Sequence, residues 1–479
     1  MNQTDPEITG NGQTIEPPTQ SLWEQLRAAI RGTEADYTQI GIGKAVFLLA
    51  VPMILELVME STFAVVDIYF VGTLGASAVA TVGLTETYMF LLYSVAMGLS
   101  MAVTAIVARR IGEKDKEQAG ISAVQAIFLA ALLSVPFALA GIFFARDLLG
   151  LMGADEWTLE HGYPYMQWMM GGNAVIVLLF TINSIFRGAG DAAIAMRVLW
   201  LANAFNIILD PVLIYGLGPF PELGIEGAAI ATNIGRGVGV LTQLWVLFHG
   251  GKHIRVLRSY LHLNGKIIAN IIRTSLGGIG QMIVAMTSWI FVMRILAEFG
   301  SQTVAGATIA LRIMMFTMMP AWGMSNAVAT LVGQNLGAQK PDRAERSVWV
   351  TGFWNMLFLV GVAVVYFLNS ESLMAIFTDD ADVIAIGGKW LTIVSYSYFV
   401  YGWWMVAVQA FNGAGDTATP TKINLVFFWL IQIPLSYVMA KVLGLGHTGV
   451  FWAIFISETS VGLFTLWLFT KGGWKTVKV

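Results

Sequence analysis

The stretch from Ala50 to Phe70 constrains this chain most, because it is apolar enough to cross a membrane and yet carries three acids. Glu56, Glu60 and Asp67 are four and seven residues apart, so they share one face of a helix. A carboxylate at bilayer depth costs roughly 3 kcal/mol, and three of them facing lipid would cost on the order of 10 kcal/mol. We therefore expect this face to line protein or a water-filled cavity, either as a functional site or as a structural stripe.

The composition predicts a membrane protein with many spans. Of the 479 residues, 56% are hydrophobic and only 12% are charged, which is too little charge for a soluble protein of this size. The chain has no cysteine, which excludes disulfides and thiolate chemistry, and its five histidines follow no metal-ligand spacing. It has no Ser/His/Asp set, HExxH motif or nucleotide motif, and its net charge of −3 does not favour nucleic acid, so we expect neither an enzyme nor a nucleic-acid-binding protein.

Apolar segments near the ~20 residues that a span requires predict an all-α polytopic fold of about twelve spans in two six-helix bundles. We place them at about residues 45–71, 79–108, 119–144, 160–185, 194–216, 225–248, 266–296, 303–335, 346–368, 384–410, 421–442 and 448–470. The expected domains are a cytoplasmic tail (1–43), an N-lobe (44–250), a cytoplasmic linker (251–265), a C-lobe (266–471) and a second cytoplasmic tail (472–479). In the first tail, residues 1–20 are expected to be disordered and Ser21–Arg31 to form an amphipathic helix, on the membrane surface or as a soluble cap.

The charges of the loops predict the orientation. Loops rich in Lys and Arg alternate with uncharged or acidic loops such as Gly72–Ala78, Pro219–Glu226 and Asn369–Asp382. By the positive-inside rule, the basic loops and both termini face the cytoplasm. We expect a multi-pass protein of the plasma (inner) membrane with an even number of spans.

The chain repeats itself at an offset of 225 residues. The sequence Phe186-Arg187-Gly188-Ala189-Gly190-Asp191 recurs as Phe411-Asn412-Gly413-Ala414-Gly415-Asp416, and Leu74-Gly75-Ala76 and Ile111-Gly112 match Phe299-Gly300-Ser301 and Leu336-Gly337. Because six spans is an even number, the two halves should insert with the same orientation, related by a pseudo-two-fold axis with a substrate cleft between them. The Gly-Ala-Gly-Asp segments are interpreted as tight helix–helix turns rather than phosphate sites.

A second polar stripe lies in the fifth span. Asn203, Asn206 and Asp210 are three and four residues apart, and Pro211 leaves one helical carbonyl without its partner. Free carbonyls, an amide and a carboxylate suit a proton or cation site, although polar residues also clamp membrane helices together. Pro211 and, in the first span, Pro52 are candidate hinges.

Other spans carry charged and flexible side chains whose roles stay open. Four charged residues could form interior ion pairs that lock conformations: Glu86, Arg236, Arg312 and Glu458. Methionines and aromatics in the eighth and tenth spans suit either a pocket for lipophilic cations or ordinary packing. The candidates for that drug cleft are Met314, Met315, Met318, Tyr401 and Trp404.

Together these motifs resemble the multidrug and toxic compound extrusion (MATE) family. The resemblance covers nearly all of residues 44–470 and rests on Pro52 fifteen residues before Asp67, on Val66–Gly75, on the paired turns and on Gly333–Ala338. It implies two lobes that rock to exchange drugs for protons or sodium ions. The chain looks most like the archaeal and DinF-like proton-coupled branch, which implies an ion-coupling site at Asp67, Asn206, Asp210 and Thr232, next to Glu60 and Asn203. Glu60 and Phe63 stand where that branch carries Gln and Tyr.

The predicted function is secondary active efflux of amphipathic or cationic compounds in exchange for protons or sodium ions. A sodium ion could bind at Asp67, Asn206 and Asp210; no other metal and no cofactor is expected. The alternative is a flippase or exporter of a lipid-linked or other endogenous metabolite, which for a polyanion should have a basic cleft, whereas these acids favour cations. The expected partners are small-molecule drugs or organic cations and membrane lipids, and we expect a monomer.

Overall fold

The computed structural model describes residues 21–250 and 253–479, and throughout these residues the regular elements are helices, without a strand. The predicted all-α fold is therefore confirmed. Residues 1–20, for which we predicted disorder, lie outside the described residues. The predicted amphipathic helix is α1 (Leu22–Arg31), which begins with a capping box between Ser21 and Glu24 and exposes Leu22 and Trp23.

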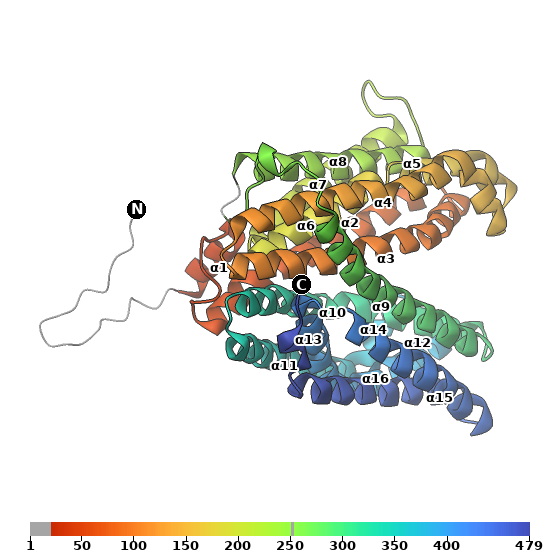
Figure 1. Cartoon of the computed structure of the whole chain (residues 1–479). Coiled ribbons are helices and arrows are strands. Elements are labelled where there is room, and N and C mark those ends of the chain that lie inside the picture. Colours follow the sequence, from red (N-terminus) through yellow and green to blue (C-terminus); the bar gives the residue numbers. More distant parts are fainter. Residues whose placement is uncertain (1–20, 251–252) are drawn as a thin grey trace, which may run out of the picture.

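The remaining helices fall into two halves of the chain. The N-lobe contains α2 (Ile42–Gly72), α3 (Ala76–Gly112), α4 (Lys116–Leu151), α5 (Tyr163–Gly171), α6 (Ala174–Ala189), α7 (Ala192–Tyr215) and α8 (Ile225–His249). The C-lobe contains α9 (Gly265–Ala297), α10 (Ser301–Gly337), α11 (Pro341–Ala375), α12 (Ala381–Ser395), α13 (Tyr398–Ala414), α14 (Ala418–Asn424), α15 (Ile433–Tyr437) and α16 (Gly446–Thr470), with π-helical turns at η3 (Leu425–Gln432) and η4 (Val438–Val442). In Figure 1 the lobes form two layers that come together near α1 and diverge towards the opposite end.

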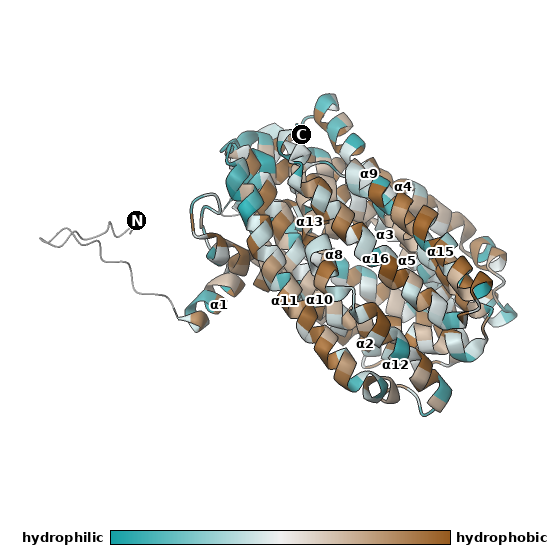
Figure 2. Ribbon diagram, turned by 90° about the horizontal axis from the view of Figure 1, so that it is seen from below, coloured by the Kyte–Doolittle hydropathy of each residue, from teal (hydrophilic) through white to brown (hydrophobic). Residues whose placement is uncertain are grey.

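Ten helical segments in the described ranges are long and apolar enough to cross a membrane, or eleven if α12 and α13, which meet at 63°, form one broken span. The predicted twelve would also need α8, which is 25 residues long but carries Thr232, Asn233 and Arg236 and does not meet the same criterion. Figure 2 shows apolar residues along most of the helices, with hydrophilic residues gathered at the end near the C-terminus. The chain is therefore a multi-pass membrane protein.

The repeat predicted from the sequence is also present in the backbone. Gly190 and Gly415 end α6 and α13 with φ of 93° and 90°, a left-handed conformation that glycine adopts without strain. The fourth and tenth spans also break at equivalent places, because Gly172 lies between α5 and α6 and Ser397 lies between α12 and α13. The two halves thus share their helix breaks and caps as well as their sequence motifs.

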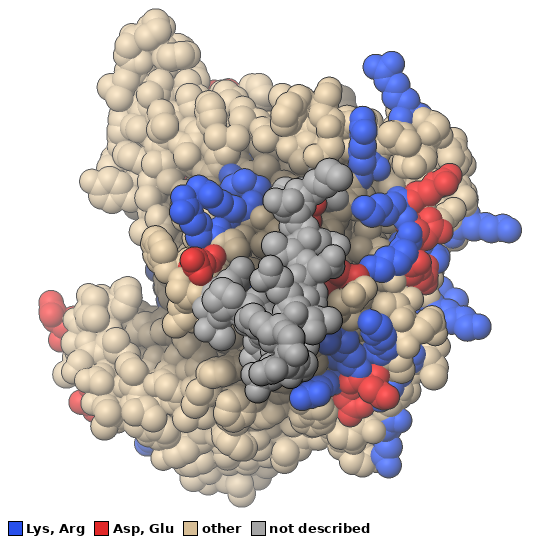
Figure 3. Space-filling model, turned by 90° about the vertical axis from the view of Figure 1, so that its left-hand side faces the viewer, with Lys and Arg blue, Asp and Glu red and all other residues tan. Residues whose placement is uncertain are grey.

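The two lobes approach closely where α3 and α10 end. A Cβ atom on Gly112 would lie 2.0 Å from the Gln334 carbonyl oxygen, and one on Gly337 would lie 2.1 Å from that of Arg109, so only glycine fits at either position. The Gln334 side chain also donates to the Gly188 carbonyl at 3.0 Å, across the lobe boundary. Lys and Arg side chains gather at this end of the molecule (Figure 3), which is the end that we predict to be cytoplasmic.

Candidate functional site

Helix α2 places two of its three acids beside a cavity between the lobes. Glu56 is 5% exposed, the Glu60 side chain is 31% exposed, and both line this cavity. Asp67, seven residues beyond Glu60, is partly buried and is not among the lining residues. Helices α2 and α7 continue through Pro52 and Pro211 without a break, and the hinge role of both prolines stays a prediction.

Glu56 is held by residues of α6. The Arg187 guanidinium donates from Nη1 to Glu56 Oε1 at 3.4 Å, and the Asn183 amide donates to the same oxygen at 3.2 Å. Gln243 of α8 donates in turn to Asn183 Oδ1 at 2.5 Å. Charge and hydrogen bonds together make burial of the Glu56 carboxylate tolerable inside the bundle.

Glu60 is the counter-ion of Arg236. Arg236 Nη2 lies 2.7 Å from Glu60 Oε1, and Asn203 of α7 donates to Glu60 Oε2 at 3.2 Å. The guanidinium carbon also lies 5.5 Å from the centre of the Phe63 ring. Arg236, which we grouped with Glu458 as an interior ion-pair candidate, therefore pairs with α2, while Glu458 accepts a hydrogen bond from Ser397 at 2.9 Å.

The second polar stripe joins α7 to α8. The Asn206 amide lies between Asp210 and Thr232. In the amide orientation that satisfies both neighbours, its nitrogen lies 2.9 Å from Asp210 Oδ2 and its oxygen 3.0 Å from Thr232 Oγ1. Asp210 is fully buried and Thr232 is 6% exposed. Asn203, one turn earlier, faces Glu60 instead. The α7 stripe is thus divided between the Asn206–Asp210–Thr232 cluster and Asn203, which contacts Glu60.

Asp67 lies close enough to this cluster for its charge to act on Asp210. It is also within electrostatic reach of Glu86 on α3 and Arg236 on α8. We call Asp67, Asn206, Asp210 and Thr232 the N-lobe acid site. No set of three His, Cys, Asp or Glu side chains in the described part of the chain could hold a metal ion. A sodium ion at the N-lobe acid site stays a prediction.

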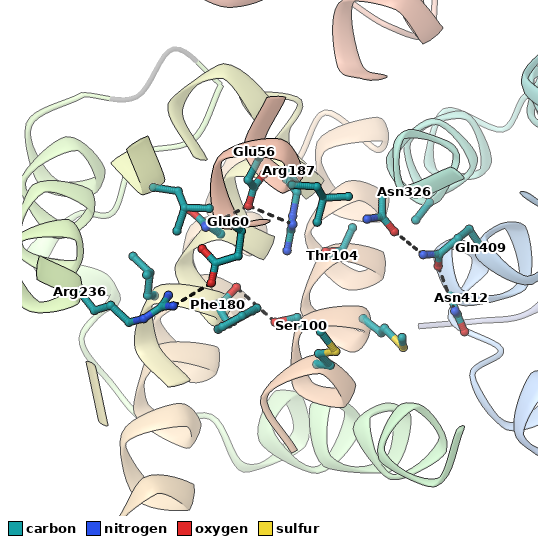
Figure 4. Close-up of a pocket in the computed structure, with 17 residues that line it drawn as sticks. Glu56, Glu60, Ser100, Thr104, Phe180, Arg187, Arg236, Asn326, Gln409 and Asn412 are labelled. Carbon is teal, nitrogen blue, oxygen red and sulfur yellow. Dashed lines mark hydrogen bonds and ion pairs between the residues drawn. The ribbon is translucent and has the colours of Figure 1, made fainter. Parts of the chain in front are cut away.

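The cavity between the lobes, called here the inter-lobe cavity, has a volume of about 180 Å³. Figure 4 shows the Glu60–Arg236 pair on one side, the amides of Asn326, Gln409 and Asn412 on the other, and Arg187 with Glu56 between them. Three pairs of lining residues are related by the 225-residue repeat: Met101 and Asn326, Thr104 and Ala329, and Arg187 and Asn412. The cavity therefore surrounds the pseudo-two-fold axis, where the two halves meet.

The C-lobe candidates lie elsewhere. Met314 and Met318 are 6% and 5% exposed in the core of the C-lobe, whereas Met315 is 48% exposed on another face of α10. The rings of Tyr401 and Trp404 pack at a tilt of 41° with their centres 4.8 Å apart. None of these five residues lines the inter-lobe cavity, so the structure does not bring the two predicted groups of binding residues together.

Sequence patterns did not single out Arg187 or Asn183 as partners of the α2 acids. Arg187 stood inside the repeated Phe-x-Gly-Ala-Gly-Asp motif, which we interpreted only as a turn. One signal was available: an acidic stripe inside a membrane needs a counter-charge, and Arg236 lies within a predicted span while Arg187 lies two residues beyond the end of another.

Comparisons with known proteins agree with the all-helical, repeated fold. The MatE family profile matches residues 52–212 and 277–438, two segments that begin 225 residues apart. The chain is 26% identical over 444 residues to the probable multidrug resistance protein YoeA of Bacillus subtilis, covering 91% of this chain and 95% of that protein. It is 26% identical over 400 residues to the FAD transporter of Shewanella oneidensis, covering 82% and 87%. The crystal structure of MATE in complex with MaL6 matches with a TM-score of 0.84 at 25% identity, covering 94% and 98%.

The family profile thus covers more than half of the chain and falls once in each lobe, at the spacing of the internal repeat. The similarity to a multidrug resistance protein and to a solved MATE structure supports the same family assignment. We conclude that this chain belongs to the MatE family of membrane transporters.

Proposed function

We propose that the protein is a secondary active exporter of amphipathic, mostly cationic small molecules, driven by inward movement of protons or, alternatively, sodium ions. The observation that carries the proposal is the N-lobe acid site, in which Asp210 is fully buried beside Asn206 and Thr232 and within reach of the Asp67 charge. Buried carboxylates inside a membrane bundle mark ion pathways and proton relays. The probable multidrug resistance protein from Bacillus subtilis supports drugs as the transported class.

Two helices connect this site to the inter-lobe cavity. Helix α2 carries Glu60 in the cavity wall and Asp67 seven residues later, about 10 Å along the helix axis. Helix α7 likewise carries Asn203 beside Glu60 and Asp210 in the acid site. Two carboxylates in a poorly solvated site titrate as a pair, so proton binding would change the packing of both helices at once and with it the cavity.

The proposed orientation puts both termini and the basic end of the molecule in the cytoplasm, in the plasma membrane. The chain has no cysteine, so single cysteines can report orientation directly. Cysteines at the exposed positions Ala76 and Ala381 should react with an impermeant thiol reagent from outside, and cysteines at Lys114 and Lys340 should not. The reverse labelling pattern would overturn the orientation.

A second candidate function is export of an anionic endogenous metabolite. The FAD transporter relative and the presence of Arg187 and Arg236 in the inter-lobe cavity favour it. Glu56 and Glu60 oppose it, because each pairs with one of the arginines and the cavity is left without net positive charge.

Purified protein in proteoliposomes tests the proposal. Uptake of ethidium into inside-out-oriented vesicles should follow an imposed pH gradient or an imposed sodium gradient, and the comparison of the two identifies the coupling ion. Asp67→Asn should remove gradient-driven transport while the protein still inserts and elutes as a single species. Wild-type rates in Asp67→Asn would show that the acid site is structural and that the proposed mechanism is wrong.

A further inference from the structure

We infer that Arg187 is an anion-binding group of the inter-lobe cavity, and that the cavity accepts amphipathic zwitterions, molecules that carry a carboxylate or phosphate beside a cationic group. The inference rests on the proposed function, because it names the substrate class of that exporter. Arg187 projects from α6 into the cavity, and its side chain is 19% exposed there.

Arg187 is weakly satisfied within the protein. A guanidinium has five N–H donors, but among the described residues this side chain makes one hydrogen bond, to Glu56 Oε1 at a long 3.4 Å. Arg236 also makes one side-chain hydrogen bond among the described residues, to Glu60 at 2.7 Å, but it is only 5% exposed and its Nε and Nη1 atoms are buried. The donors left over on Arg187 are therefore the accessible positive charge of the cavity, in a geometry that suits bidentate binding of a carboxylate or phosphate.

The same cavity offers an accessible negative charge. Glu60 is 31% exposed in spite of its pairing with Arg236, whereas Glu56 is almost fully buried. A purely cationic ligand would be attracted by Glu60 but repelled by Arg187. A purely anionic ligand would be attracted by Arg187 but repelled by Glu60. A ligand with both charges can satisfy Arg187 and Glu60 together, which is how a charge-balanced cavity selects its ligands.

The opposite wall is neutral and polar. Asn412 occupies the position that the repeat makes equivalent to Arg187; it donates to Gln409 at 3.0 Å, and its own Oδ1 is buried without a partner in the described structure. Gln409 donates further to Asn326. These amides supply hydrogen bonds without adding charge, and Met97, Met101 and Phe180 supply apolar contact for the rest of the ligand.

A matched pair of dyes tests the inference. Tetramethylrhodamine free acid is a zwitterion, and its methyl ester keeps the cationic ring system but loses the carboxylate charge. Fluorescence anisotropy with purified protein in detergent should show tighter binding of the free acid, by on the order of tenfold for one charge-assisted hydrogen-bonded contact. Equal affinities, or tighter binding of the ester, would overturn the inference.

Two variants locate the effect. Arg187→Gln should reduce the preference for the free acid to near unity, and the double variant Glu56→Gln with Arg187→Gln should do the same without leaving a buried acid unpaired. Arg146→Gln, at an exposed arginine that does not line the cavity, should keep the wild-type preference. A double variant that still prefers the free acid would place the anion site elsewhere. Export of the ester by wild-type protein without a binding preference would refute only this inference, whereas absence of gradient-driven export of both dyes would refute the proposed function.

Discussion

The two lobes share a backbone plan but differ in what they bury. Glu56, Glu60 and Asp67 of α2 have Gln281, Ala285 and Val292 as their counterparts 225 residues later on α9. Gln281 is also buried and polar, but the other two positions have lost their polar groups. The N-lobe thus keeps charges inside the bundle, and the C-lobe replaces them with neutral side chains.

The same contrast holds for α7. The counterparts of Asn203, Asn206 and Asp210 are Phe428, Ile431 and Leu435, which fall in and just after the π-helical turn η3. Helix caps and lobe contacts depend on backbone geometry, so duplication preserves them in both halves. An ion site depends on a few side chains, and one copy is enough for coupling. The difference supports the proposed placement of ion coupling in the N-lobe.

The largest difference in export is expected between variants of the buried acids of the two lobes, Asp210 and Glu458. Asp210→Asn should abolish gradient-driven export. Asparagine carries no ionisable group, so the N-lobe acid site then keeps only one of its two carboxylates for binding and releasing the coupling ion. Glu458→Gln should retain most export, because Glu458 is held by Ser397 and pairs with no basic residue in the parts of the chain that the structure describes. Proteoliposome transport under a pH gradient gives the comparison. Loss of export in Glu458→Gln with a normal rate in Asp210→Asn would reverse the assignment of the lobes.

Ion pairs of the two lobes should differ in their effect on stability. Arg236→Gln leaves the Glu60 carboxylate without its partner inside the bundle and should lower the free energy of unfolding by about 3–5 kcal/mol. The double variant Glu60→Gln with Arg236→Gln should recover much of that loss, because no unpaired charge remains. Lys441→Gln, which breaks an exposed pair with Glu298 in the C-lobe, is the control and should leave the melting temperature unchanged. Thermal denaturation in detergent measures all three.

The fold could be predicted from the sequence to a large extent, because its signals are local. Span length and the repeated glycines at 190 and 415 depend only on neighbouring residues along the chain, and both are present in the structure. The acidic face of α2 was predictable for the same reason. Which residue meets that face was not, because pairing depends on the rotation of neighbouring helices: Arg236 faces α2 and not Glu458. Likewise, periodicity shows that Met314 and Met315 point apart but not which of the two is buried.

A third test concerns the methionines of α10, where burial differs between neighbours. Met318 is 5% exposed within the C-lobe core, so Met318→Ala should cost about 2–5 kcal/mol of stability and reduce export of every substrate alike. Met315 is 48% exposed, so Met315→Ala should change stability by no more than about 0.5 kcal/mol. Any effect of Met315→Ala should then appear as a change in which drugs are exported. Substrate-selective changes in Met318→Ala would instead assign the buried methionine to the drug cleft.

The smallest effect should come from the segment that joins both lobes at the basic end, residues 33–41. Asp36 accepts from Lys114 of the N-lobe at 2.5 Å, and Lys340 at the start of α11 in the C-lobe donates to the Thr38 carbonyl at 2.9 Å. The Lys114 contact is therefore an ion pair, whereas the Lys340 contact, like those of Arg343 with the Tyr37 and Ile40 carbonyls, joins a charge to a neutral carbonyl. Lys114 is 63% exposed, so Lys114→Gln should cost only about 0.2–1 kcal/mol.

Salt and pH distinguish the two contacts of this segment. Burial alone would raise the pKa of Asp36, but hydrogen bonds from Lys114 and Thr38 hold it at about 2, below the ordinary value of 3.8. A lowered pKa adds stability that is fully present above the ordinary value and is lost as the pH falls towards about 2. The difference in melting temperature between wild type and Lys114→Gln should therefore be constant from neutral pH down to about pH 5 and should shrink only in stronger acid. High salt should also reduce it, because the pair is exposed, while the effect of Lys340→Gln should depend less on salt. A Lys114→Gln difference that changes near neutral pH would mean that a group other than Asp36 controls this contact.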